Sequence, residues 1–287
     1  MPVRTWWIGA RPRTLPAAVV PVAVGTAAGA RSGEVVWWLA ALCLLVSLAL
    51  QVGVNFANDY SDGVRGTDEG RTGPVRLVAS GMARPSQVRA AAALSFGVAG
   101  VGGLAAAAAT SWWLVAVGAA SIAAGALYTG GPKPYGYLGL GEAFVFVFFG
   151  TVATCGTAFV ATGSVGAVAA ASSVPVGLLS VALLMANNLR DIPGDQLSGK
   201  RTLAVRIGDA AMRRVLAATF VATAVGLAAV GALAPWSAVS MLGLVAAVDP
   251  VGRVIRGAAG RDLVPVLEGT ARVQILVGAL LAAGLSI

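Results

Sequence analysis

The chain of 287 residues is 57% hydrophobic and 11% charged, with a mean hydropathy of +0.83 and a formal net charge of +8. This composition excludes an ordinary water-soluble domain, in which about a quarter of the residues are charged. The basic excess does not indicate a nucleic-acid partner, because the basic residues fall in short connections between apolar runs rather than on one soluble face.

Nine apolar stretches follow one another along the chain, and each has about the length that crosses a bilayer as a helix. Their abundant Gly and Ala suit close helix packing in lipid, and tryptophans lie at their ends, where interfacial anchors are expected. We therefore predict one all-α domain over residues 1–287, a polytopic membrane bundle of about nine transmembrane helices. The stretches are 15–30, 36–56, 90–110, 112–128, 138–160, 165–186, 210–233, 236–254 and 263–285.

Basic residues are distributed unevenly between alternate connections. One set, which includes the N-terminus, carries nearly all of them, whereas the opposite set carries only Arg31. The positive-inside rule places the first set and the N-terminus in the cytoplasm and the C-terminus outside. High Ala, Gly, Val and Arg content favours a bacterial genome, so the predicted location is a bacterial cell membrane with lipid as a partner.

Scarce residue types restrict the chemistry. The chain contains no His, which removes the usual general base at neutral pH and the commonest zinc and haem ligand. Cys43 and Cys155 lie in apolar stretches without CxxC spacing, which predicts packing residues rather than a disulfide or a thiolate metal site. Catalysis must then use carboxylates, metals, basic side chains, tyrosine and the substrate itself.

Two of the predicted cytoplasmic segments resemble each other and indicate an internal repeat. The first contains Asn58-Asp59-Tyr60-Ser61-Asp62, and the second extends from Asn187 through Asp191 to Asp195. In each, an Asn precedes an Asp by four residues, a spacing that directs both side chains from one helix face. Two half-bundles would bring these aspartate-rich loops together across a central cavity.

Carboxylate and amide oxygens without His or Cys suit a hard cation such as Mg²⁺, which substrate phosphates complete. Nearby basic residues match a diphosphate, namely Arg71, Arg76, Lys133, Lys200 and Arg201. A single motif of this kind is more often a set of solvated ion pairs, but two on one membrane face favour a site. Such a site favours cleavage of an allylic diphosphate, because metal and basic groups neutralise the leaving group.

A family resemblance is carried by the aspartate run 58–62, with Arg71, Thr72 and Arg76 behind it, and by the run 191–195, which Gly199 and Lys200 follow. The chain resembles the UbiA superfamily of intramembrane prenyltransferases over nearly its whole length. The resemblance implies nine helices around a cavity, two Mg²⁺ ions on the aspartate motifs and a lipid-side tunnel for the isoprenoid. Within the superfamily, the longer runs at 10–25, 58–81, 128–150 and 187–208 look most like the enzymes that transfer a polyprenyl group from its diphosphate to 1,4-dihydroxy-2-naphthoate. That likeness implies loss of CO₂ and a demethylmenaquinol product in menaquinone synthesis.

The predicted site has four groups of residues. Asp62, Asp191 and Lys133 are expected to be catalytic; Asn58, Asp59, Asp62, Asp68, Asn187, Asp191 and Asp195 to bind metal; Arg71, Arg76, Tyr128, Lys133 and Lys200 to bind diphosphate; and Arg11 and Arg13 to bind the carboxylate of the acceptor. The sequence departs from the family at Gly66, where a third aspartate is common, and Asp68 follows two residues later.

Two kinds of alternative remain open. The first keeps the chemistry and changes the acceptor to 4-hydroxybenzoate or a polyprenyl sugar phosphate. The second is a small-molecule membrane transporter, because carriers also combine repeated halves with intramembrane polar residues. Most acidic residues cluster at the cytoplasmic connections rather than at the bilayer midplane, and this distribution favours the enzyme.

Overall fold

The structure, a computed structural model, describes residues 3–67 and 75–287, and every regular element in these ranges is a helix. The elements are α1 (Val3–Ala10), η1 (Pro12–Thr14), α2 (Pro16–Ala30), α3 (Trp37–Val64), α4 (Pro85–Ala109), α5 (Leu114–Leu127), η2 (Tyr135–Leu138), α6 (Gly141–Val145), η3 (Phe146–Val152), α7 (Ala153–Thr162), α8 (Ala167–Leu197), α9 (Leu203–Ile207), α10 (Asp209–Leu233), η4 (Pro235–Ala247), α11 (Val248–Ile255), η5 (Gly260–Asp262) and α12 (Leu263–Leu285).

Each predicted apolar stretch falls on a helix or on a continuous helical run. Among the described residues, seven helical spans are long and apolar enough to cross a bilayer, which makes this a multi-pass membrane protein. The remaining two stretches form α2 and α5, which are apolar but have only 15 and 14 residues. The predicted helical bundle is therefore confirmed. Of the roughly nine predicted crossings, seven correspond to helical spans that are long enough to cross a bilayer.

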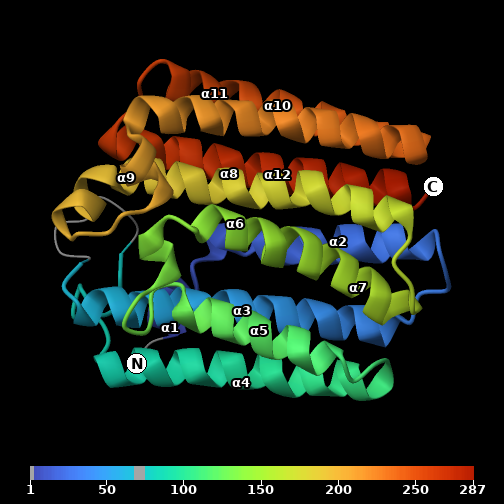
Figure 1. Cartoon of the computed structure of the whole chain (residues 1–287), viewed down its shortest axis with the longest axis horizontal. Coiled ribbons are helices and arrows are strands. Elements are labelled where there is room, and N and C mark those ends of the chain that lie inside the picture. The colour runs from blue at the N-terminus through green and yellow to red at the C-terminus, as the bar shows by residue number, and fades with distance from the viewer. Residues whose placement is uncertain (1–2, 68–74) are drawn as a thin grey trace.

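The two halves of the chain form two sides of the bundle (Figure 1). Helices α3, α4 and α5 lie on one side, α8, α10, α11 and α12 lie on the other, and α2 and the α6–α7 run lie between them. The largest buried cluster joins α2, α8, α10 and α12 through Val24, Leu179, Leu216, Leu227 and Leu281. Many large apolar side chains on the outer faces are exposed, as expected where lipid replaces water.

The aspartate motifs are helical, which corrects the expectation that they form loops. The apolar stretches 36–56 and 165–186 end before the helices do, because α3 continues to Val64 and α8 to Leu197. Hydropathy marks the part of a helix that lies in lipid, whereas the hydrogen-bond ladder ends only where capping or packing stops it. The last two to three turns of α3 and α8 therefore carry Asn58, Asp62, Asn187, Asp191 and Asp195 as rigid helical positions.

The uneven distribution of basic residues corresponds to the two ends of the bundle. The ends of α3 and α8 and the beginnings of α10 and α12 lie at one end, together with α9 (Figure 1). The C-terminus of the chain and the end of α2, which Arg31 follows, lie at the opposite end. The basic end is therefore also the end that carries both aspartate motifs.

Glycines allow the central helix α2 to approach its neighbours closely. A Cβ at Gly25 would lie 2.4 Å from the carbonyl oxygen of Thr154 on α7, and a Cβ at Gly278 of α12 would lie 2.4 Å from Val20 Cγ1. Helices in lipid associate mainly through such close packing, because the hydrophobic effect does not distinguish lipid from protein.

These contacts predict that Gly25→Ala destabilises the bundle. The added methyl group would meet backbone on α7, and overpacking of this kind costs about 1–3 kcal/mol. Gly97→Ala on α4 is the matched control, because its Cβ meets nothing within 4 Å and Ala is the better helix former. Thermal unfolding in detergent should show a lower midpoint for Gly25→Ala alone; equal midpoints would contradict the assigned packing.

Candidate active site

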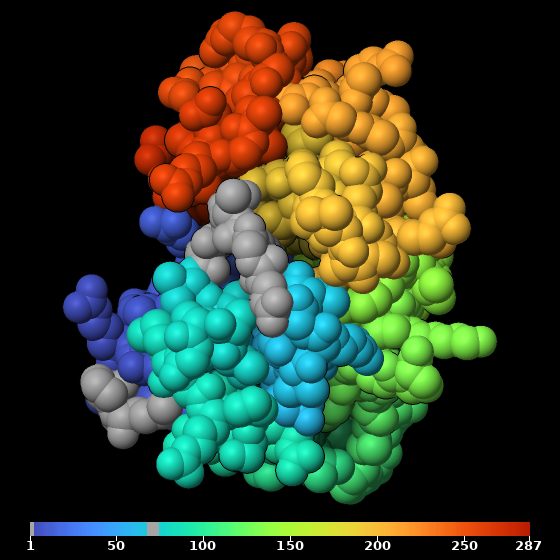
Figure 2. All heavy atoms as spheres, turned by 90° about the vertical axis from the view of Figure 1, so that its left-hand side faces the viewer, coloured from blue at the N-terminus to red at the C-terminus, as the bar shows by residue number. Residues whose placement is uncertain are grey.

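A cavity of about 1050 Å³ lies between the two halves of the bundle. Side chains of α3, α5, α7 and α8, and of the segment before α2, contribute to its walls. Viewed from the end where α3 and α8 finish, the molecular surface is hollowed between these two helices (Figure 2). Polar and charged residues line the part of the cavity near this end, and apolar residues line most of the remainder.

The first motif divides between two faces of α3. Asn58 and Asp62 line the cavity, and Asn58 Oδ1 accepts a hydrogen bond of 2.8 Å from Thr129 Oγ1. Asp59 is fully buried outside the cavity lining, because neighbouring helical residues point about 100° apart. Its two carboxylate oxygens accept the backbone N–H groups of Leu77 and Val78 at 2.8 and 3.0 Å. This arrangement gives Asp59 a structural role and does not support its expected role as a metal ligand.

Asp62 is the centre of a buried charged cluster. Its Oδ1 lies 3.0 Å from Lys200 Nζ and accepts a 2.5 Å hydrogen bond from Tyr137 Oη, and its Oδ2 lies 3.9 Å from Arg76 Nη2. Lys200 Nζ also lies 4.9 Å from the centre of the Tyr137 ring. Burial, followed by the negative charge of Asp62, raises the pKa of Tyr137, so its hydroxyl stays protonated and donates.

The second motif faces the same cavity from α8. Asn187, Asp191 and Asp195 all line it, one helical turn apart. Arg190, also in the lining, is buried and binds both oxygens of Asp191, at 2.8 and 2.9 Å. It also donates to Asn187 Oδ1 at 3.1 Å. Arg190 is not among the site residues predicted from the sequence, although its place within the second motif was a signal for the site.

The remaining predicted residues divide into those at the cavity and those away from it. Tyr128 and Arg11 line it. Lys133 is exposed and lies outside the cavity lining, so the structure does not bring it to the aspartates. Arg13 reaches the lining, but its side chain is 58% exposed and forms a 3.0 Å ion pair with Glu268. Asp68 and Arg71 lie outside the described residues.

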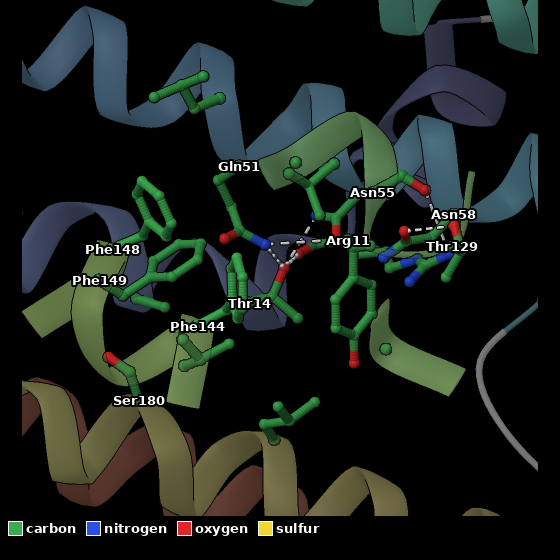
Figure 3. Close-up of a pocket in the computed structure, with 18 of the residues that line it drawn as sticks. Arg11, Thr14, Gln51, Asn55, Asn58, Thr129, Phe144, Phe148, Phe149 and Ser180 are labelled. Carbon is green, nitrogen blue, oxygen red and sulfur yellow. Dashed lines mark hydrogen bonds between the residues drawn. The ribbon is translucent and has the colours of Figure 1, made fainter. Parts of the chain in front are cut away.

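A polar network continues from the aspartate motif into the interior of the bundle (Figure 3). Gln51 and Asn55 are buried on the cavity side of α3, about two turns and one turn deeper than Asn58. Their side-chain amides both donate a hydrogen bond to Thr14 Oγ1, at 3.1 and 3.0 Å. The backbone oxygen of Asn55 accepts a hydrogen bond of 3.3 Å from Arg11 Nη2. Arg11 has a φ of 51°, and it is the only non-glycine residue with a positive φ in the described part of the chain. Such strain persists where the surroundings require it, and here it directs Arg11 to the cavity.

Aromatic rings form another wall of the cavity. Tyr135 stacks on Phe144 at a centroid distance of 4.0 Å, and Phe148 follows at 6.1 Å from Phe144. Residues Phe146–Val152 form a π-helix, an element that occurs often at functional sites. Phe148 and Phe149 both line the cavity near Gln51 (Figure 3).

The oxygen ligands at the polar end suit a hard cation whose coordination shell is completed by the substrate. Asn58, Asp62, Asn187, Asp191 and Asp195, which the two motifs direct to the cavity, offer side-chain oxygens, the ligand type of Mg²⁺. Among the described residues, no three His, Cys, Asp or Glu side chains gather closely enough to form a metal cage by themselves. Mg²⁺ often takes only one or two carboxylates and relies on substrate phosphates, so the arrangement matches that use.

Known proteins share the fold and much of the sequence. A protein of Mycobacterium tuberculosis named 1,4-dihydroxy-2-naphthoate octaprenyltransferase is 48% identical over 279 residues, which cover 97% of this chain and 95% of that protein. The apo structure of a UbiA homolog from Aeropyrum pernix K1 superposes with a TM-score of 0.70 at 17% identity and covers 94% of this chain and 97% of its own. A UbiA homolog from Archaeoglobus fulgidus bound to GPP and Mg²⁺ gives a TM-score of 0.63 at 13% identity and covers 96% and 99%.

The pattern of the UbiA prenyltransferase family matches residues 18–255, which include both aspartate motifs and most of the cavity wall. Together with the identity to the mycobacterial relative, this match establishes the family without dependence on the structural likeness. The chain belongs to the UbiA prenyltransferase family.

Proposed function

We propose that this protein transfers a polyprenyl group from polyprenyl diphosphate to 1,4-dihydroxy-2-naphthoate, with loss of CO₂, and forms a demethylmenaquinol. The observation that carries the proposal is one cavity that joins two aspartate motifs and buried basic groups to an aromatic wall. The choice of acceptor is supported by the mycobacterial relative, whose name specifies this naphthoate.

The diphosphate would bind at the polar end. Lys200, Arg76 and Tyr137 converge on Asp62, and Arg190 lies on the opposite motif. These groups donate charge-assisted hydrogen bonds of the kind that diphosphate oxygens accept. We propose two Mg²⁺ ions held by Asn58, Asp62, Asn187, Asp191 and Asp195; when bound, they would neutralise charge on the departing diphosphate.

The prenyl chain would lie along the apolar and aromatic wall. Heterolysis of the allylic C–O bond leaves its electron pair on the diphosphate and a positive charge on the allyl group. The faces of Tyr135, Phe144 and Phe148 offer negative quadrupole potential to such a cation. The wall also excludes water, which would otherwise compete with the aromatic acceptor.

The acceptor carboxylate would bind Arg11. Its guanidinium lies in the cavity wall and is held by the polar network around Asn55. Arg13 is a weaker candidate, because Glu268 already pairs with it at an exposed position.

We also propose that α2 and α5 cross the membrane despite their length, giving nine crossings in a bacterial cell membrane. Nine crossings place the two termini on opposite sides, and the basic end is expected to face the cytoplasm. The diphosphate end of the cavity would then open toward the cytoplasm, the compartment that would supply the water-soluble, anionic naphthoate.

The metal assignment predicts the behaviour of two aspartate variants. Purified enzyme with Mg²⁺, polyprenyl diphosphate and dihydroxynaphthoate should release CO₂ and prenylated quinol together, and EDTA should abolish both. Asp62→Asn and Asp191→Asn should each lower kcat by about 100-fold or more, because charge stabilisation of the leaving group is lost. Asp249→Asn is the control, since this carboxylate is exposed and pairs with Arg253 within its own helix. Full turnover in both variants would overturn the assignment.

The two lysines of the chain should differ in their effect on the prenyl substrate. Lys200→Ala should raise the KM for polyprenyl diphosphate about 10-fold or more, because it removes a charged donor at the polar end. Lys133→Ala should have a smaller effect, since Lys133 is exposed outside the cavity. Initial rates at saturating naphthoate measure both values. The opposite order would restore the sequence-based assignment of Lys133.

Substitution of the two candidate arginines should have different effects on the KM for the acceptor. Arg11→Gln should raise this KM about 10-fold or more, which is the range for loss of a hydrogen bond to a charged group. Arg13→Gln should change it less, because Arg13 is largely exposed and bound to Glu268. The KM for polyprenyl diphosphate should stay constant in both variants. A larger effect at Arg13 would transfer the carboxylate site to that residue.

A further inference from the structure

The hydrogen-bond network around Thr14 determines how each of its amides is oriented. The Thr14 hydroxyl donates its single hydrogen to the Arg11 carbonyl oxygen at 2.9 Å, so its oxygen can only accept from other groups. It accepts from Gln51 Nε2 and from Asn55 Nδ2. Asn55 gives its second amide hydrogen to the Ala10 carbonyl oxygen at 2.9 Å. Asn55 Oδ1 therefore accepts the second hydrogen of Gln51, at 3.3 Å.

Gln51 cannot be turned around without cost. A flipped amide would place Gln51 Oε1 against Thr14 Oγ1 and Asn55 Oδ1, and neither atom has a hydrogen to give. Both hydrogens of the Gln51 amide are therefore donated within the network, and its oxygen Oε1 takes no part in the network. In the described part of the chain, no donor binds this oxygen, which points into the cavity on the side of Phe148 and Phe149 (Figure 3).

We infer that Gln51 Oε1 accepts a hydrogen bond from a ring hydroxyl of the aromatic acceptor and thereby selects acceptors that carry it. A fixed carbonyl oxygen in a cavity requires a donor, and the prenyl chain offers none. In 1,4-dihydroxy-2-naphthoate, the 1-hydroxyl is adjacent to the carboxylate and can donate to it internally. The 4-hydroxyl has no such partner and is the donor assigned to Gln51. This inference rests on the proposed function.

The same network would then recognise two features of the acceptor. The backbone oxygens of Arg11 and Asn55 bind Thr14 Oγ1 and Arg11 Nη2, respectively, so the network connects the carboxylate site with Gln51. Hydrogen-bond donation by the 4-hydroxyl to Gln51 also increases electron density in the ring that must attack the allyl cation. An acceptor that lacks a donor here would leave Gln51 Oε1 without a partner, which disfavours its binding.

The test compares binding of 1,4-dihydroxy-2-naphthoate with that of its 4-methyl ether under anaerobic conditions. The ether keeps the ring and the carboxylate but cannot donate at position 4. Wild-type protein should bind the hydroxyl compound about 10-fold more tightly, and Gln51→Met should reduce this preference to near one. Ser47→Ala is the matched control: Ser47 also lines the cavity on α3, its hydroxyl donates to the Ala18 carbonyl oxygen, and its loss should preserve the preference.

A second variant covers the case in which Gln51→Met does not fold. Gln51→Leu also removes the accepting oxygen, with a side chain of a different shape, and should likewise reduce the preference for the 4-hydroxyl to near one. An unchanged preference in either folded variant overturns the inference. Failure of wild-type protein to bind or prenylate any naphthoate would instead refute the proposed function, so the two failures are distinguishable.

Discussion

The structure depends on the burial of ionised groups at one end of a membrane bundle. Isolated charges cannot be buried at an acceptable free energy, so each must be paired within the protein. Asp62 is accordingly surrounded by Lys200, Arg76 and Tyr137, and Asp191 is bound by Arg190 through two hydrogen bonds. A diphosphate with its metal ions could exchange partners with these groups without leaving a buried charge uncompensated. The site is therefore charge-balanced in advance, and the proposed substrate would redistribute the pairs.

Helix continuity gives this cluster its geometry. Because α3 and α8 extend beyond their apolar stretches, the motif residues stand at fixed angles on helices instead of moving on loops. The same continuity places Gln51, Asn55, Asn58 and Asp62 on one face of α3, so one helix connects the polar end with the aromatic part of the cavity. Hydrogen bonds from Gln51 and Asn55 to Thr14 Oγ1, and from Asn55 to the Ala10 carbonyl oxygen, hold the segment before α2 against that face.

Much of this could be predicted from the sequence, and the failures have specific physical causes. Periodicity and hydropathy predicted the helices, and i, i+4 spacing correctly directed Asn58 and Asp62, and likewise Asn187, Asp191 and Asp195, to one cavity. The same spacing argument, applied to Asp59, would have separated it from the site. Lys133 follows Gly131-Pro132 and Lys200 follows Ser198-Gly199, and only tertiary packing decides which of the two lysines turns inward. Gln51 and Asn55 were missed because they are uncharged and lie within an apolar stretch, where buried amides give a weak hydropathy signal.

The proposed reaction also explains why a site without histidine is sufficient. Electrophilic attack on most aromatic rings creates a cationic intermediate that must lose a ring proton, and a general base normally removes it. When the prenyl group attaches to the carbon that bears the carboxylate, the C–C bond to that carboxylate breaks instead, and its electrons restore the aromatic ring as CO₂ leaves. The protein then has to hold an ionised carboxylate and an electron-rich ring in position, and it has no ring proton to remove. Arg11 and the amides of α3 can perform that task without a titrating group. The absence of histidine and the presence of a rigid polar network therefore agree with a decarboxylating transfer, in which positioning replaces acid–base catalysis at the ring.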